Sequence, residues 1–143
     1  MRTIPPVTLD QVLGLVKYIA SAGGVVDSSR LDEMLDVDMN LLPHVVDAAV
    51  QLGLLRTDDG NLIITDAGRR ILSAYGKDLR LLIRSLCDDV MPFKKIFDAI
   101  GDDDKISRSA LEAILREAGY SNIDSVLAIF TEWLAYMGVS VTS

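Results

Sequence analysis

Apolar residues recur at helical spacing near the start of the chain. In residues 8 to 22 they occupy one face, and Thr8 with Gln11 three positions later forms the capping box that opens a helix. Gly23 and Gly24 are typical of the end of such a helix. The predicted buried face consists of Val12, Leu15, Val16 and Ile19.

Two further helices are predicted before residue 53. A short strand or turn leads into a short helix that begins near Asp27 or Ser28. Residues 38 to 52 predict a third helix, with Asp38 as its cap. Pro43 fits a helix only in the first turn, which supports a start near residues 38 to 40. The inward-facing residues are Leu31, Met34 and Leu35 in the second helix, and Leu42, Val45, Val46, Ala49 and Val50 in the third.

A hairpin is predicted after the third helix. The sequence "LLRTDDGNLIIT" has two strand-like runs around Asp59 and Gly60, a pair that suits a tight turn. Three helices followed by a two-stranded wing, all within about 60 residues, are typical of the winged helix-turn-helix. The expected wing residues are Arg56, Asp58, Asp59 and Gly60.

The next segment predicts two helices in succession. Thr65 or Asp66 caps the first, which ends or bends at Gly76, and residues 77 to 88 form the second. We expect the first helix to contain Ile71, Leu72 and Tyr75. In the second, Leu79, Leu82, Ile83, Leu86 and Cys87 share one face, and Arg80 and Arg84 lie outside on the other.

Three more helices complete the chain. Pro92 opens one, and Ser109 with Glu112 predicts a second capping box for the next. The last helix carries a broad apolar stripe, and "VSVTS" after it resembles a wing strand. We therefore predict a mainly α protein with a small β-wing, built as two tandem winged-helix-like units, residues 1–76 and 77–143, with the second packed on the first.

Length and charge limit the function. The chain has 143 residues, half of them hydrophobic, which is enough for a core. Its 14 basic and 21 acidic residues repel nucleic acid and anionic lipid at long range. No apolar run reaches the roughly 18 residues of a membrane span, and the N-terminus lacks a signal-peptide core. We therefore expect a cytoplasmic protein without membrane insertion.

The predicted recognition helix is poorly suited to DNA. No lysine or arginine occurs between Arg30 and Arg56, and residues 1–76 hold six basic and ten acidic residues. Nucleic acid is thus a disfavoured partner. The alternative is a transcription regulator that dimerises through the last helix and binds DNA through Arg69, Arg70, Lys94 and Lys95.

Catalysis is not expected. His44 is the single histidine, at the boundary of a buried stripe, and Cys87 lies on an apolar stripe where a thiol is buried and inert. The acidic "GDDDKISRSALE" fails as a calcium loop, because Lys105 and Ile106 stand where an oxygen ligand and a glycine are needed. We predict no catalytic residue, metal or cofactor, and no phosphate-binding loop is present.

The last helix offers two interpretations. Ile129, Trp133, Tyr136 and Met137 widen its apolar face beyond what one small core needs, which indicates a face for a protein partner or a homodimer. Alternatively, these residues seal the junction between the two halves. A weaker hypothesis places a small-ligand sensor at that junction.

The sequence also resembles a known family. "PPV" with "LGL" in the first helix, "LLPHVVDAAVQLGLL" and "LIITDAGRRIL" resemble the AAA-associated C-terminal domain, which is found behind the ATPase domain of ABC transporter subunits of the nitrate, sulfonate and bicarbonate type. The resemblance continues through "VMPFKKIFDAI" to "EWLAY", whereas the "LAYMG" after Trp133 is less polar than the family tends to be. No ATPase half precedes these residues, so we expect a free-standing member or an excised piece.

The resemblance implies a regulatory or protein-interaction module associated with an ABC-type ATP-binding subunit. That subunit would be its protein partner. The shared motifs are structural leucine and glycine positions, so no catalytic residue is carried over. An acidic wing then serves as a protein contact or a packing element.

Overall fold

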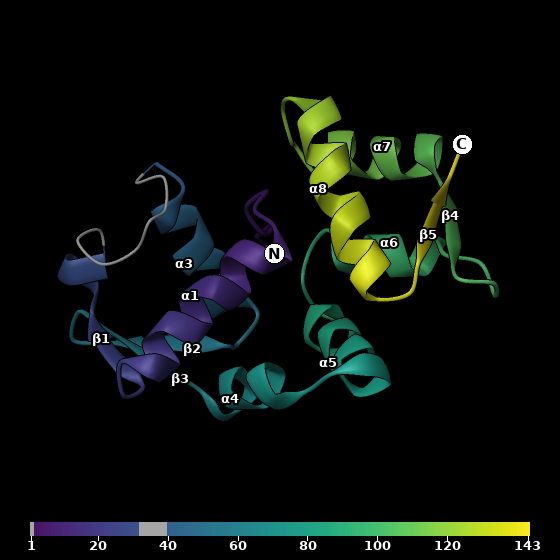
Figure 1. Ribbon diagram of the computed structural model, residues 1–143. Coiled ribbons are helices and arrows are strands. Elements are labelled where there is room, and N and C mark those ends of the chain that lie inside the picture. The colour runs from purple at the N-terminus through teal and green to yellow at the C-terminus, as the bar shows by residue number, and fades with distance from the viewer. Residues whose placement is uncertain (1, 32–39) are drawn as a thin grey trace.

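The first half of the chain folds into helices around a three-stranded sheet (Figure 1). A computed structural model describes residues 2–31 and 40–143. In chain order the elements of this half are α1 (Leu9–Ser21), β1 (Val25–Asp27), the 3-10 helix η1 (Ser28–Arg30), α3 (Leu42–Gln51), β2 (Leu55–Asp58), β3 (Asn61–Ile64) and α4 (Asp66–Ser73). The expected mainly α fold with a small β-wing is confirmed.

The capping box of α1 is present as predicted. The Thr8 hydroxyl accepts from the Gln11 backbone N–H at 3.1 Å, and the Gln11 side chain accepts from the Thr8 N–H at 2.9 Å. Two of the free N–H groups at the helix start are thereby paired. All four predicted inward residues are buried, and Leu9 joins them.

Helix α3 begins later than expected. It starts at Leu42, with no side chain capping it, and Pro43 lies in the first turn as predicted. The expected cap Asp38 lies outside the described residues, as do Met34 and Leu35 of the predicted second helix. Of the predicted stripe, Val45 and Ala49 are buried, whereas Leu42, Val46 and Val50 are half-buried.

The wing forms at the predicted turn. Strands β2 and β3 pair antiparallel, with Leu55 opposite Ile64. Asp59 and Gly60 have φ angles of 52° and 80°, the positive values that a two-residue hairpin turn requires at both positions. Strand β1 adds to the other edge of β3, which gives the sheet order β1-β3-β2.

The second half consists of helices and one pair of short strands. Its elements are α5 (Gly76–Cys87), α6 (Phe93–Ala99), β4 (Lys105–Ser107), α7 (Arg108–Glu117), α8 (Ile123–Tyr136) and β5 (Ser140–Thr142). As predicted, "VSVTS" contains a strand, but it pairs parallel with β4. In the first half, β1 and β2 also run in the same direction, with β3 between them. No third strand separates β4 and β5 within the described residues.

Two sequence predictions about the helices from α4 onward are wrong. Tyr75 is not in α4, which ends at Ser73; the chain is extended at Ala74 and Tyr75, and Gly76 starts α5 with a φ of 59°. The second capping box is also absent. Helix α7 is capped by the hydroxyl of Ser107, which accepts from the Ala110 N–H at 3.1 Å.

The physical reason for the second error is the register of the cap. Counting from Ser107, the third helical residue is Ala110, which has no carboxylate to reach back to the cap N–H. Glu112 lies two residues further along the helix and forms an ion pair with Arg116 at 2.8 Å instead.

The segment before α1 lies between the two halves (Figure 1). We call residues 2–7 the N-terminal strap. The Ile4 N–H donates to the Met91 carbonyl at 2.8 Å, the Tyr120 hydroxyl donates to the Ile4 carbonyl at 2.5 Å, and the Trp133 indole N–H donates to the Val7 carbonyl at 2.7 Å. The strap is thus bonded to three places in the second half.

Candidate functional site

Exposed apolar side chains gather on one part of the described surface. Among the described residues, the large hydrophobic side chains that are exposed are Val25 at 50%, Leu72 at 36%, Tyr75 at 82% and Leu81 at 55%. Three of these four lie on α4, on α5 or between the two helices. Such clustering marks a surface that a partner can cover, whereas isolated apolar residues are ordinary.

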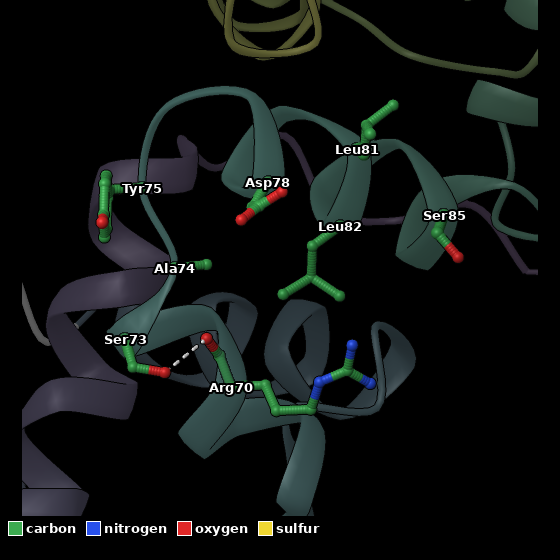
Figure 2. Close-up of a pocket in the computed structure, with 8 residues that line it drawn as sticks. All are labelled: Arg70, Ser73, Ala74, Tyr75, Asp78, Leu81, Leu82 and Ser85. Carbon is green, nitrogen blue, oxygen red and sulfur yellow. Dashed lines mark hydrogen bonds between the residues drawn. The ribbon is translucent and has the colours of Figure 1, made fainter.

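A hollow of about 580 Å³ lies between α4 and α5. We call it the α4–α5 groove; it is lined by Arg70, Ser73, Ala74, Tyr75, Asp78, Leu81, Leu82 and Ser85. Figure 2 shows Asp78 and Leu82 projecting from α5 toward α4, where the Arg70 side chain extends beneath Leu82. Tyr75 and Ser85 stand at opposite ends, and Leu81 points away from α4 at the rim.

Helix α4 is held in place by the wing. The Thr65 hydroxyl donates to the Gly53 carbonyl at 2.6 Å and accepts from the Gly68 N–H at 3.1 Å. Gly68 lies so close to the sheet that an added Cβ would be 2.4 Å from the Leu54 carbonyl oxygen. One wall of the groove is therefore anchored to the first half.

Helix α5 is held by the second half. Ile83 and Cys87 are buried at 1% and 0% exposure. Arg84, which we expected outside, is half-buried: its guanidinium lies 5.3 Å from the centre of the Phe97 ring and forms a 3.1 Å ion pair with Asp104. The α4–α5 groove thus lies where the two halves meet.

The sequence that contains the groove is rich in basic residues, although the charged residues of the groove lining are one arginine, Arg70, and one aspartate, Asp78. Residues 67–87 contain five basic residues and one acidic residue, whereas the remainder of the chain contains nine basic and twenty acidic residues. Within the described part of the chain, Arg84 is the member of this segment that forms an ion pair. The other four basic residues are Arg69, Arg70, Lys77 and Arg80.

A comparison with protein families identifies the chain. Residues 29–142 match the family described as the C-terminal AAA-associated domain. The chain belongs to this family. Its description links the domain with AAA-type ATPases. The search of curated proteins and the search of solved structures each gave no match.

The wing of this AAA-associated domain is exposed at its tip. Arg56, Asp58, Asp59 and Gly60 are all exposed, as expected of a wing. The turn is fixed from one side, because the Ser28 N–H and hydroxyl donate to the Gly60 carbonyl at 2.9 and 2.7 Å. The wing therefore presents the Asp58 and Asp59 carboxylates on a turn held by hydrogen bonds, and this surface repels phosphate.

The predicted docking face on α8 is turned inward. Trp133 and Met137 are 1% and 2% exposed, and Ile129 and Tyr136 are half-buried. Trp133 bonds to Val7, and the Tyr136 hydroxyl donates to Asp10 at 2.7 Å. These contacts fit the alternative interpretation, in which α8 seals the junction between the halves.

The basic residues of the DNA-binding alternative do not share one hollow. Arg70 lines the α4–α5 groove, whereas Lys94 and Lys95 on α6 line a different one with Met91 and Asp98. Lys95 also forms a 3.4 Å ion pair with Glu117. The structure therefore does not gather the two basic doublets around one cavity.

Cys87 and His44 lie in different environments, one buried and one exposed. Cys87 is buried as predicted, and burial raises the pKa of its thiol above the ordinary range, so the reactive thiolate is disfavoured. His44 is exposed on α3. Among the described residues, no group of three or more histidine, cysteine, aspartate or glutamate side chains is placed to hold a metal ion.

The acidic loop after α6 uses its carboxylates locally. Asp104 pairs with Arg84, and Asp103 lies 3.8 Å from the Lys105 ammonium.

No helix in the described part of the chain is long and apolar enough to cross a bilayer.

Sequence reasoning missed the α4–α5 groove. It placed Leu72 and Tyr75 in a single helix and gave them no surface role. The available signal was the cluster of five basic residues in 67–87, combined with Leu81, which falls outside the apolar stripe of its helix.

Proposed function

We propose that this AAA-associated domain is a non-catalytic interaction domain that docks on the ATP-binding subunit of an ABC-type transporter. The observation that carries the proposal is that two of the exposed apolar side chains, Tyr75 and Leu81, line the α4–α5 groove. Membership of the family supports an ATPase as the partner. A regulatory role in the cytoplasm, where such subunits bind ATP, is part of the same proposal.

The family resemblance specifies which subunit to test. An ATP-binding subunit of the nitrate, sulfonate and bicarbonate type, from the same genome, is purified and titrated with the domain by isothermal titration calorimetry. We expect a one-to-one complex with a Kd of about 1 μM, in the range of regulated protein contacts. An absence of heat with both proteins at about 100 μM would overturn the proposal.

The ATPase rate of the complex tests the regulatory part. We expect the domain to change the rate of ATP hydrolysis by the subunit and to hydrolyse no ATP alone. Binding without any change in rate would reduce the proposal to docking. Hydrolysis by the isolated domain would contradict its non-catalytic character.

Nucleic acid is tested separately. Fluorescence anisotropy of labelled random duplex DNA at low salt makes weak non-specific binding visible, because counterion release strengthens it there. We expect no binding at about 100 μM protein, given the acidic chain and wing. Salt-sensitive binding would favour the transcription-regulator alternative.

A further inference from the structure

We infer that the α4–α5 groove binds an acidic amphipathic helix of the partner protein, with apolar side chains against Leu82 and Tyr75 and carboxylates against Arg70 and Lys77. This inference rests on the proposed function and gives the chemistry of the docking segment. The steps that lead to it concern the shape, the charge and the register of the groove.

The shape favours a polypeptide over a small ligand. The hollow is long and open, and Tyr75 at one end of it is 82% exposed. From Tyr75 to Ser85 the groove follows α5 over about ten residues, or roughly 15 Å of helix. A partner helix laid along this length can contact Tyr75 and Leu82 in the groove and Leu81 at its rim, as in helix-in-groove recognition.

The charge favours an acidic segment. Arg70 lines the groove, and Lys77 is exposed at the start of α5, next to the lining residue Asp78. Within the described part of the chain, Arg70 and Lys77 form no ion pair, so both are available to partner carboxylates. A symmetric dimer through this face would place two such basic segments against each other, which costs free energy.

Asp78 specifies the register of the partner helix. Its carboxylate projects into the groove from α5 (Figure 2). A partner carboxylate opposite Asp78 would be repelled, so a donor or an apolar residue must stand there. The same carboxylate disfavours DNA phosphates and anionic lipid, whose negative charge is continuous.

The first experiment maps the site on the full chain. The ¹⁵N-labelled protein is titrated with a synthetic amphipathic helix of leucine and glutamate, about 18 residues long because shorter helices are marginal in water. We expect amide shifts confined to residues 67–87 and their contacts. A matched peptide with lysine in place of glutamate is expected to bind at least about tenfold more weakly. Equal binding of both peptides, or shifts centred elsewhere, would overturn the inference.

Matched variants test the apolar contacts and the charged contacts separately. Tyr75→Ser with Leu81→Ser removes exposed apolar surface, and its control is Val25→Ser, the exposed apolar residue on β1. Binding is expected to fall at least about tenfold in the double variant and to stay within about twofold in the control. Equal effects would mean that the groove is not the binding site.

The basic residues at the groove are tested against a pair of lysines elsewhere, with the same change in net charge. Arg70→Glu with Lys77→Glu is expected to weaken binding of the acidic peptide at least about tenfold, whereas Lys94→Glu with Lys95→Glu on α6 has little effect. All four side chains are exposed, so both variants are expected to keep the wild-type circular dichroism spectrum. Equal weakening by the two variants would show a response to net charge and overturn the inference.

Two further arms separate this inference from its rivals and from the proposed function. Stronger binding to vesicles containing phosphatidylglycerol than to the acidic peptide would identify a lipid surface and overturn it. Peptide binding at the groove without binding of the ATP-binding subunit would leave the groove site intact and refute the proposed function. Binding of the ATP-binding subunit that is unchanged in both groove variants would support the proposed function and refute the groove as the docking site.

Discussion

Trp133 shows how one side chain joins the last helix to the start of the chain. Its indole N–H donates to the Val7 carbonyl at 2.7 Å, and its ring lies 5.3 Å from the ring of Phe93, centre to centre. The side chain is 1% exposed, so water cannot replace the indole as the donor. The Val7 carbonyl therefore depends on this residue.

Replacing Trp133 with phenylalanine is expected to destabilise the protein. The change keeps an aromatic ring but leaves the buried Val7 carbonyl unpaired and reduces packing, which costs about 1–3 kcal/mol of the free energy of unfolding. Urea denaturation followed by circular dichroism measures the loss. Tyr136→Phe, which removes the solvent-exposed bond to Asp10, is the control and should cost less than about 1 kcal/mol. Equal losses would contradict the role given to Trp133.

Tyr120 makes stability depend on alkaline pH. Burial raises the pKa of Tyr120 to about 12, whereas in the unfolded chain it is about 10. The folded protein keeps a proton that the unfolded chain releases, so this contribution to stability is complete below about pH 10 and is lost as the pH rises toward about 12. Because the hydroxyl is partly exposed, we expect a loss of about 1 kcal/mol.

The matched variant is Tyr120→Phe. Urea denaturation at a series of pH values should show a steeper loss of stability for the wild type than for the variant above about pH 10. The pKa of Tyr136 is also raised, by its hydrogen bond to Asp10, and this residue is the same in both proteins. Parallel curves would show that Tyr120 ionises equally in the folded and unfolded states.

At the scale of elements, the contact between α4 and the wing fixes the position of the groove. Gly68 is the point of closest approach, because an added Cβ would lie 2.4 Å from the Leu54 oxygen and 2.7 Å from a methylene carbon of Ile64. The Leu54 carbonyl lies just before β2 and accepts from the Thr65 N–H at 3.1 Å, so it cannot move aside as the end of a side chain can. Only glycine allows this helix to lie so close to the sheet.

Gly68→Ala is therefore expected to be destabilising. Separating α4 from the sheet should cost about 2–3 kcal/mol and perturb the α4–α5 groove. The control is Gly14→Ala on α1, where an added Cβ meets no atom within 4 Å. That change should raise stability by up to about 1 kcal/mol, because alanine favours helix more than glycine does. Thermal denaturation of both variants checks the opposite signs.

The capping residues illustrate how far local sequence predicted the elements. Thr8 and the Asp59-Gly60 turn were predicted correctly, because each depends on groups within three or four residues of sequence. Ser107 and Ser109 are both plausible caps, and the choice between them is set by the pairing of β4 with β5, which ends at Ser107. A contact between distant strands is not visible in a local pattern.

At the scale of the whole molecule, one continuous hydrophobic core runs through both halves. It joins residues of α1 and the sheet to those of α6, α7 and α8. The division at residues 76 and 77 stays a prediction, and the strap contacts argue for cooperation between the halves. The sole tryptophan, Trp133, lies at their junction and reports on it.

Unfolding is expected to be a single transition. In urea, the fluorescence of Trp133, which reports the junction, should change at the same concentration as the circular dichroism of all helices. Coincidence is expected because separating the halves breaks the strap bonds and exposes core residues. Two separated transitions would show that residues 1–76 and 77–143 fold independently.

The candidate site was harder to predict than the fold. Periodicity correctly identified the apolar stripe of α8, but it could not distinguish a stripe that seals a junction from one that meets a partner. The α4–α5 groove depends on the extended residues Ala74 and Tyr75, which separate the two helices. They leave the Tyr75 side chain exposed and place α5 beside α4. This arrangement follows from the anchoring of the two helices to different halves.

The N-terminal strap also determines how a mechanical load would enter the molecule. Tension applied at Arg2 would act on its 2.9 Å ion pair with Asp47 of α3, on the bond from Gln51 to the Thr3 carbonyl, and on the bond from Ile4 to Met91. Helix α1 would be loaded only after those bonds. A pull on the start of the chain would therefore be shared between α3 in the first half and the connection into α6 in the second half before it reached α1.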